Sequence, residues 1–276
     1  MEGKRVLITG GNSGIGIVTA RELAKQGAEV VLACRDTAKT TAALKVINAG
    51  ASTPAINLPV ELDNLGSVRN LAANFLGRYD RLDVLINNAG VFPPKQRTTV
   101  DGFEMQMGVN HLSHFLLTNL LLDCLKASSP ARVVTVSSKL HKAGEIDFEV
   151  FKGYENYNSQ SAYNSSKLAN VLFGIELARQ LEGTGVTSNV LHPGAVSTDI
   201  IRDLPWLLRK IIGMIFISPE KGALTNIMLA SDPALVETNG KYYDQCELTD
   251  FSSQADDRVL CKKLWDVSAE LTGLGG

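Results

Sequence analysis

Short apolar runs alternate with longer amphipathic stretches along most of the chain. Five of these runs are rich in β-branched residues and almost continuously apolar, which is typical of parallel strands buried on both faces. The runs occupy residues 5–9, 28–34, 82–88, 131–137 and 186–192. A weaker sixth candidate is 55–62, where Pro59 permits only an edge strand or the boundary of a strand.

Helical patterns fill the intervals between these runs. Helices are expected near residues 14–26, 37–49, 65–79, 102–126 and 161–182. Alternating strands and helices with short connections predict an α/β fold with a doubly wound parallel sheet (Rossmann), which binds ligands at the carboxyl ends of its strands. Because no repeat, charge block or linker interrupts the 276 residues, we expect a single domain spanning 1–276.

One apolar segment departs from this alternation. Residues 203–217, DLPWLLRKIIGMIFI, are too few to span a bilayer. Three interpretations stay open: a lid at about 199–218 over an apolar pocket, a peripheral contact with a membrane surface, or an extra core helix. The near-helical spacing of the apolar residues fits all three.

Composition and charge mainly exclude certain classes of partner and site. The net charge of −2 argues against a nucleic-acid partner. The four cysteines are scattered without a C-x-x-C pair, which indicates reduced thiols and no metal site. The chain enters a strand pattern at once, and no apolar stretch reaches the roughly 18 residues of a spanning helix. We therefore expect a soluble, cytoplasmic protein without a signal peptide or transmembrane anchor.

A glycine-rich turn follows the first predicted strand. The segment TGGNSGIG (9–16) places Gly10, Gly14 and Gly16 at the start of a predicted helix. Glycines permit a tight turn and a close backbone approach, and free N–H groups at a helix start can hold a pyrophosphate. Turns use glycine freely, but this position between strand and helix predicts dinucleotide binding.

The end of the second predicted strand bears on which dinucleotide binds. An NAD site usually has an acid about 20 residues past the glycines, whereas the chain reads Cys34, Arg35, Asp36. A guanidinium suits a 2′-phosphate, and Asp36 is expected to be a helix N-cap. We favour NADP(H) over NAD(H). The Ser13 hydroxyl is either a further phosphate contact or only part of the turn.

Residues 161–167, SAYNSSK, place Tyr163 four positions before Lys167. On a helix these two side chains share a face. An ammonium near a phenol favours the phenolate, so Lys167 is expected to lower the pKa of Tyr163 toward acid/base work near neutral pH. The same spacing also arises by chance on solvated helix faces, so the other motifs must decide.

Several motifs, in a fixed order, resemble the short-chain dehydrogenase/reductase family in its single-domain division. The resemblance extends from Thr9 to about Tyr243. The matching segments are TGGNSGIG for the glycine turn, NNAG (87–90) after the fourth strand, VNH (109–111) for a helix asparagine, VSS (136–138) for the catalytic serine, YNSSK (163–167) for the Y-x-x-x-K pair and HPGAVST (192–198) for the loop beside the nicotinamide.

The resemblance implies a site assembled from distant parts of the chain. The catalytic residues would be Asn110, Ser138, Tyr163 and Lys167, with Ser137 the less favoured alternative to Ser138. The cofactor would contact the glycine turn, the ends of the second and third strands and the later motifs, through Gly10, Asn12, Ser13, Gly14, Ile15, Gly16, Arg35, Leu62, Asp63, Asn87, Ala89, Gly90, Tyr163, Lys167, Pro193, Gly194, Val196 and Thr198.

The resemblance also implies hydride transfer between a nicotinamide and a carbonyl carbon. Tyr163 would be the acid in reduction and the base in oxidation. Lys167 would hold the nicotinamide ribose, and Ser138 would hydrogen-bond the carbonyl oxygen. Asn110 would steady Lys167 through a water molecule. With NADP(H), carbonyl reduction is the expected direction.

The segments LACRD, SSKLAN and LHPG and the long gap between Ser138 and Tyr163 are most similar to the retinol-dehydrogenase-like branch. The gap is expected to form a substrate loop at about 140–160. We expect a small-molecule substrate, an apolar or bulky aldehyde, ketone or alcohol. No N-terminal membrane anchor is evident in the sequence, which argues against a membrane-borne retinoid.

Other interpretations of these motifs differ in class. A catalytically silent NADP(H)-binding scaffold or redox sensor would keep the same fold. A methyltransferase has no need for Y-x-x-x-K, and a nucleotide-sugar epimerase usually has a different glycine spacing and a larger C-terminal domain.

The apolar helix near 114–125 leaves a homodimer open, since related enzymes often pair through this helix and the one that carries Tyr163. His111 and His114 lie on or beside it, and we expect structural or substrate-lining roles for them rather than metal ligation.

Overall fold

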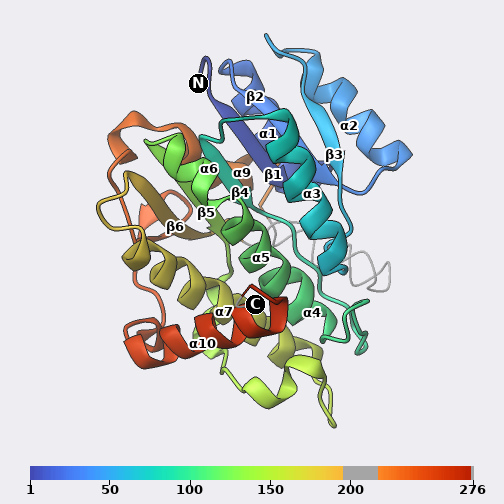
Figure 1. Ribbon diagram of the computed structural model, residues 1–276, viewed down its shortest axis with the longest axis vertical. Helices are drawn as coiled ribbons and strands as arrows, with labels where there is room; N and C mark the ends of the chain where they lie inside the picture. The colour runs from blue at the N-terminus through green and yellow to red at the C-terminus, as the bar shows by residue number, and fades with distance from the viewer. Residues whose placement is uncertain (195–216, 275–276) are drawn as a thin grey trace.

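The computed structural model describes residues 1–194 and 217–274. Its centre is a sheet with strand order β3-β2-β1-β4-β5-β6-β7-β8 (Figure 1). The strands are β1 (Arg5–Thr9), β2 (Glu29–Cys34), β3 (Ile56–Pro59), β4 (Val84–Asn87), β5 (Ala131–Val136), β6 (Val186–His192), β7 (Tyr242–Asp244) and β8 (Glu247–Leu248). Neighbours from β3 to β7 run parallel, and β8 pairs antiparallel with β7. The predicted parallel sheet is confirmed, and the strand that ends in Pro59 lies at its edge.

The helices lie between these strands as the sequence predicts, with local differences. They are α1 (Gly14–Lys25), α2 (Ala38–Asn48), α3 (Leu65–Arg78), α4 (Met105–Met107), α5 (Ser113–Leu120), α6 (Leu122–Ala127), α7 (Ser159–Gln180), α9 (Pro219–Ser231) and α10 (Arg258–Thr272). The helix expected over 102–126 is divided by a π-helical turn, η1 (Gly108–Leu112), and by a break at Leu121. Helices α9 and α10 and strands β7 and β8 were not among the predicted elements.

Each face of the sheet has its own apolar core. On β1, Leu7 points to the core formed with α3, α5, α7 and α10, whereas Val6 and Ile8 point to the core formed with α1, α2 and α9. This alternation follows from the two-residue period of a strand. Burial on both faces explains why the strand sequences are nearly continuous in apolar residues.

The C-terminal helix α10 lies across α5 and α7 (Figure 1). The Trp265 ring packs edge-on against Phe115, with 4.9 Å between centroids, and stacks on Phe173 at 5.8 Å. The Ser268 hydroxyl is hydrogen-bonded to Nε2 of His111 at 2.8 Å. Because α10 covers these helices, a homodimer through the same faces would compete with it. The homodimer stays a prediction.

The predicted substrate loop, about 140–160, contains two 3-10 turns, η2 (Lys139–Ala143) and η3 (Phe148–Lys152), before α7 begins. The predicted lid at about 199–218, with the apolar segment 203–217, lies almost wholly outside the described residues. Within residues 1–194 and 217–274, no helix combines the length and apolar character needed to cross a membrane.

Candidate active site

The end of β1 is hydrogen-bonded to the segment that follows β4. The Thr9 hydroxyl accepts hydrogen bonds from the backbone N–H groups of Asn88 (2.9 Å) and Ala89 (3.0 Å). Nε2 of buried His114 lies 2.9 Å from the same hydroxyl, and the Asn88 amide donates to the Thr9 carbonyl at 2.8 Å. These contacts fix the glycine turn against the NNAG segment. Asn88 was not among the predicted site residues, although it lies between two of them, Asn87 and Ala89, in the motif.

The predicted glycines are required by the geometry of the turn. Gly10 and Gly14 have φ of +66° and +52°, the left-handed region that favours glycine. A Cβ on Gly16 would collide with the Gly10 carbonyl, and a Cβ on Gly10 would lie 3.1 Å from Ala89. The turn thus brings backbone close to backbone at the N-terminus of α1, where helix N–H groups favour an anion. Ile15 lies buried in the first turn of α1, and Ser13 occupies the N-cap position without a capping hydrogen bond from its side chain.

A chain of hydrogen bonds connects this turn to the end of β2. The Asn12 amide donates to the Thr40 hydroxyl at 2.8 Å, and that hydroxyl donates to the Arg35 carbonyl at 2.6 Å. The Arg35 side chain is exposed. The expectation that Asp36 caps α2 is wrong, because Thr37 is the N-cap residue and its hydroxyl accepts the N–H of Thr40.

Cys34 ends β2 beside the glycine turn. Burial raises the pKa of its thiol to about 11, against hydrogen bonds from backbone N–H groups of the turn that lower it. The thiol therefore stays protonated at neutral pH, as expected of a reduced, buried cysteine.

Leu62 and Asp63 follow β3, and both are half-buried. The Asp63 carbonyl accepts the N–H of Val100 at 2.9 Å, which fixes the backbone at this position. Both residues thus lie in the connection after the carboxyl end of a strand, the edge at which open α/β sheets bind ligands.

The NNAG segment divides into a structural and a more open part. Asn87 is 1% exposed at the end of β4, and its amide donates to the Thr118 hydroxyl at 2.9 Å, so this side chain supports the sheet. Ala89 and Gly90 are half-buried. A Cβ on Gly90 would lie 3.4 Å from both Oδ1 of Asn110 and Nζ of Lys167, so Gly90 lies directly against these two predicted catalytic residues.

Asn110 lies on the π-helical turn and uses its whole amide on protein partners. Its Oδ1 accepts the N–H of Val91 at 2.8 Å, and its Nδ2 donates to the Val91 carbonyl at 3.2 Å and to the Ser166 hydroxyl at 3.0 Å. π-helical turns are rare, and they are found frequently at functional sites. The water bridge from Asn110 to Lys167 stays a prediction.

Tyr163, Ser138 and Lys167 come together on α7 and the end of β5. The Ser138 side chain lies close enough to the Tyr163 phenol to lower the pKa of the phenol. Nζ of Lys167 lies 5.6 Å from the centroid of the Tyr163 ring and donates to the Val136 carbonyl at 3.2 Å. Lys167 is 2% exposed, and burial lowers its pKa to about 8.

The expected lowering of the tyrosine pKa is wrong for this arrangement. Burial raises the pKa of Tyr163 to about 12, and the nearby Ser138 side chain lowers it only in part. Desolvation disfavours the phenolate more strongly than the favourable contacts stabilise it. Tyr163 is therefore protonated at neutral pH.

The two candidate serines have different partners. The Ser137 hydroxyl donates to the Lys167 carbonyl at 2.7 Å and so fastens α7 to the end of β5. Ser138 is the neighbour that contacts the phenol. This geometry favours Ser138 over Ser137 for contact with a reacting group.

Pro193 and Gly194 follow β6, and Gly194 has a φ of +88°. Val196 and Thr198 lie outside the described residues. His111 and His114 make the structural hydrogen bonds given above, and within residues 1–194 and 217–274 no three His, Cys, Asp or Glu residues are grouped to hold a metal ion.

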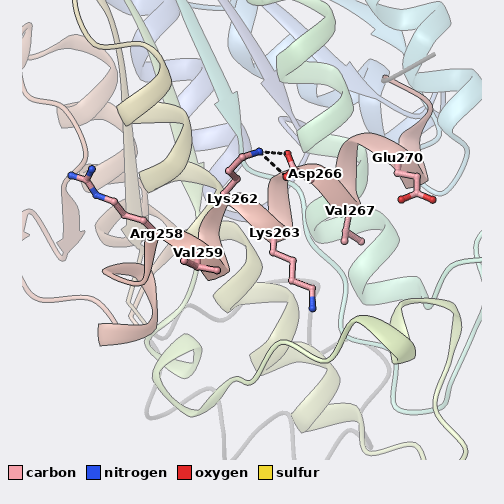
Figure 2. A pocket seen from close by; sticks show the side chains of 7 residues that line it. All are labelled: Arg258, Val259, Lys262, Lys263, Asp266, Val267 and Glu270. Carbon is pink, nitrogen blue, oxygen red and sulfur yellow. Dashed lines mark hydrogen bonds and ion pairs between the residues drawn. The ribbon is translucent and has the colours of Figure 1, made fainter.

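A surface hollow of about 530 Å³ lies along α10 (Figure 2). An ion pair of 2.7 Å joins Lys262 and Asp266 at its edge. Its lining residues are Arg258, Val259, Lys262, Lys263, Asp266, Val267 and Glu270. None of them is a predicted site residue, so the converging side chains at the strand ends, and not this hollow, define the candidate site.

Known proteins resemble this chain in both sequence and structure. A family model described as short chain dehydrogenase matches residues 4–205. Retinol dehydrogenase 14 of Mus musculus is 46% identical over 291 residues, which cover 99% of this chain and 87% of the relative. Retinol dehydrogenase 13 of Homo sapiens is 45% identical over 282 residues, covering 99% and 85%.

Solved structures share the fold. An uncharacterised protein from Mycobacterium Paratuberculosis superposes with a TM-score of 0.79 at 35% identity, covering 99% of this chain and 94% of that one. The complex of Pseudomonas aeruginosa RhlG with NADP superposes with a TM-score of 0.72 at 25% identity, covering 88% and 95%. The chain therefore belongs to the short-chain dehydrogenase family of oxidoreductases and is retinol-dehydrogenase-like within it.

Proposed function

We propose that this protein is an NADP(H)-dependent oxidoreductase that transfers hydride between the nicotinamide and the carbonyl or alcohol carbon of an apolar or bulky aldehyde, ketone or alcohol. Tyr163 is its general acid/base. The observation that carries the proposal is the grouping of the Tyr163 phenol, the Ser138 hydroxyl and the Lys167 ammonium beside Gly90.

The chain offers a cradle that fits a dinucleotide. Gly10 and Gly16 pack too closely for a Cβ, and the tight turn that they form ends at the start of α1, where helix N–H groups favour a phosphate. Arg35 supplies an exposed guanidinium at the end of β2 for a 2′-phosphate. A relative of the same fold, RhlG, was solved in complex with NADP.

The nicotinamide, when bound, supplies the hydride. Tyr163, protonated at neutral pH because of its raised pKa, donates its phenolic proton to the carbonyl oxygen in reduction. Ser138 donates a hydrogen bond to the same oxygen as negative charge develops on it. Among the described residues the Lys167 ammonium has one hydrogen-bond acceptor, the Val136 carbonyl. Its remaining N–H donors are available to the ribose hydroxyls.

The raised pKa of Tyr163 keeps the phenol in the protonated form that carbonyl reduction requires. An acid that holds its proton at neutral pH is ready to protonate a carbonyl oxygen, whereas oxidation requires the phenolate. The apolar or bulky character of the substrate rests on the retinol dehydrogenases among the relatives.

The test is the loss of NADPH absorbance with a panel of aldehydes and ketones that ranges from small to long-chain and aromatic. The proposal predicts turnover of apolar members with NADPH, and a lower kcat/KM with NADH. Tight NADPH binding without turnover of any member would instead support a silent cofactor-binding scaffold or sensor.

A further inference from the structure

A short segment after NNAG is held from both sides. On one side Asn110 binds both backbone polar groups of Val91, at 2.8 Å and 3.2 Å. On the other side the Pro93 carbonyl accepts the Ser159 hydroxyl at 2.6 Å and the Tyr157 hydroxyl at 3.4 Å. The residue between these two anchors is Phe92, so its backbone has little freedom to move.

The Phe92 ring packs directly on the proposed acid/base. Its centroid lies 4.9 Å from the centroid of the Tyr163 ring, with an interplanar angle of 90°. This edge-to-face geometry is one of the favoured arrangements of an aromatic pair. Since Lys167 lies 5.6 Å from the same ring centroid, the orientation of the phenol is set by an aromatic ring and a cation together.

Phe92 also presents apolar surface beside the phenol. Both Phe92 and Tyr163 are half-buried, so neither residue is wholly enclosed by the protein. A carbonyl compound whose oxygen reaches the Tyr163 hydroxyl brings the carbon atoms that flank its carbonyl close to this pair of rings. Burial of those carbon atoms against Phe92 is favourable in proportion to the apolar area removed from water.

Resting on the function proposed above, we propose that Phe92 is a positioning and specificity-determining residue of this site. Its ring edge holds the Tyr163 phenol in the orientation needed for proton transfer, and its exposed surface binds the apolar groups that flank the substrate carbonyl. The hydrogen bonds of Asn110 and Ser159 to the neighbouring backbone keep the ring in place.

The test compares Phe92→Ala and Phe92→Leu with the wild type, using NADPH with nonanal and with propanal. Phe92→Ala removes the aromatic contact, so kcat should fall about three- to tenfold with both aldehydes. It also removes the apolar wall, so KM should rise for nonanal and change little for propanal. Phe92→Leu keeps apolar bulk without a ring, and should restore the KM for nonanal while kcat stays low.

Tyr79→Ala is the matched control. Tyr79 pairs with Phe75 at a similar centroid distance, 5.1 Å, and packs under Arg5 at the start of β1, the opposite end of the strand from the glycine turn. This variant should keep wild-type kcat and KM for both aldehydes.

The Kd for NADPH, measured by fluorescence, should be unchanged in both Phe92 variants.

Three results would overturn the inference: an unchanged kcat in Phe92→Ala, equal rises in KM for both aldehydes, or a KM for nonanal in Phe92→Leu as high as in Phe92→Ala. A wild-type protein that binds NADPH but reduces no aldehyde would refute the proposed function itself, and the inference with it. Wild-type turnover combined with unaffected Phe92 variants would refute the inference alone.

Discussion

Replacing Lys167 with methionine should abolish activity and yet stabilise the protein. Burial lowers the pKa of Lys167 from 10.5 to about 8. Each pKa unit corresponds to about 1.36 kcal/mol, so the charged lysine costs the folded protein about 3 kcal/mol at neutral pH. Methionine is of similar length and carries no charge. The Val136 carbonyl keeps a hydrogen-bond donor in the Asn170 amide, at 3.1 Å.

The pH dependence of this gain has a definite sign. The folded-state pKa is depressed, so the unfolded chain binds more protons than the folded protein between pH 8 and 10.5. The cost is complete below pH 8 and disappears as the pH rises through 10.5, where the lysine is neutral in both states. The advantage of Lys167→Met should therefore shrink over this interval.

Urea unfolding followed by circular dichroism at several pH values between 7 and 10 measures the effect, with melting temperature as a second readout. At pH 7 we expect Lys167→Met to raise the melting temperature by about 5–10 °C. Lys262→Met, at an exposed lysine on α10, is the matched control and should change stability by about 0.5 kcal/mol or less. A Lys167→Met protein that is less stable than the wild type at pH 7, with a difference that does not vary with pH, would show that the buried charge of Lys167 does not destabilise the fold.

Other predictions follow from single contacts. Arg35→Ala should weaken binding of NADPH about tenfold relative to NADH in fluorescence titrations, since a charge-assisted phosphate contact is lost; equal affinity changes would contradict the assigned role. Burial lowers the pKa of His114 from 6.5 to about 4, so the free energy of unfolding should fall as the pH falls from 6.5 to 4. In His114→Gln the free energy of unfolding should vary less over this pH range, and an unchanged slope would argue against the contribution of His114. Trp265→Ala should lower the free energy of unfolding by about 3 kcal/mol, because the cavity removes contacts with Phe115 and Phe173; a loss below about 1 kcal/mol would show that α10 is not anchored by this ring.

The sheet was predictable because strands that are buried on both faces have nearly continuous apolar sequences. Runs such as residues 5–9 and 131–137 are apolar at consecutive positions, and the structure has strands at both. Strands β7 and β8 have three and two residues, which are too few to form a recognisable apolar run. The turn between these two strands is formed by Gln245 and Cys246, and both residues have a positive φ. Neither is glycine or asparagine, so the usual sequence signal of a hairpin turn is missing.

The helix over 102–126 was predicted as continuous because its apolar pattern is continuous. Its π-helical turn contains Asn110, whose hydrogen bonds to Val91 and Ser166 join parts of the chain that residue spacing does not connect. Helix α10 was missed at the sequence level, although its apolar residues pack on α5 and α7.

The sequence predicted which residues would form a candidate site, but it did not predict the pKa values of these residues. The motifs identified Ser138, Tyr163 and Lys167, and the fold brings the three together. The i, i+4 spacing predicted a lowered pKa for Tyr163, whereas burial raises it. Desolvation is a property of the folded environment and has no local signature. The role proposed for Phe92 has no sequence signal for a related reason, since its ring contact with Tyr163 is a feature of the folded protein.

In the proposed mechanism, Tyr163 transfers a proton to the substrate oxygen while hydride moves from bound NADPH. Single-turnover reduction of an apolar aldehyde by Tyr163→Phe, preloaded with NADPH, tests it most directly. The account predicts an NADPH affinity close to that of the wild type and a hydride-transfer rate lower by about a hundredfold or more, as expected on loss of a general acid. A variant that oxidises NADPH at the wild-type rate would contradict the claim.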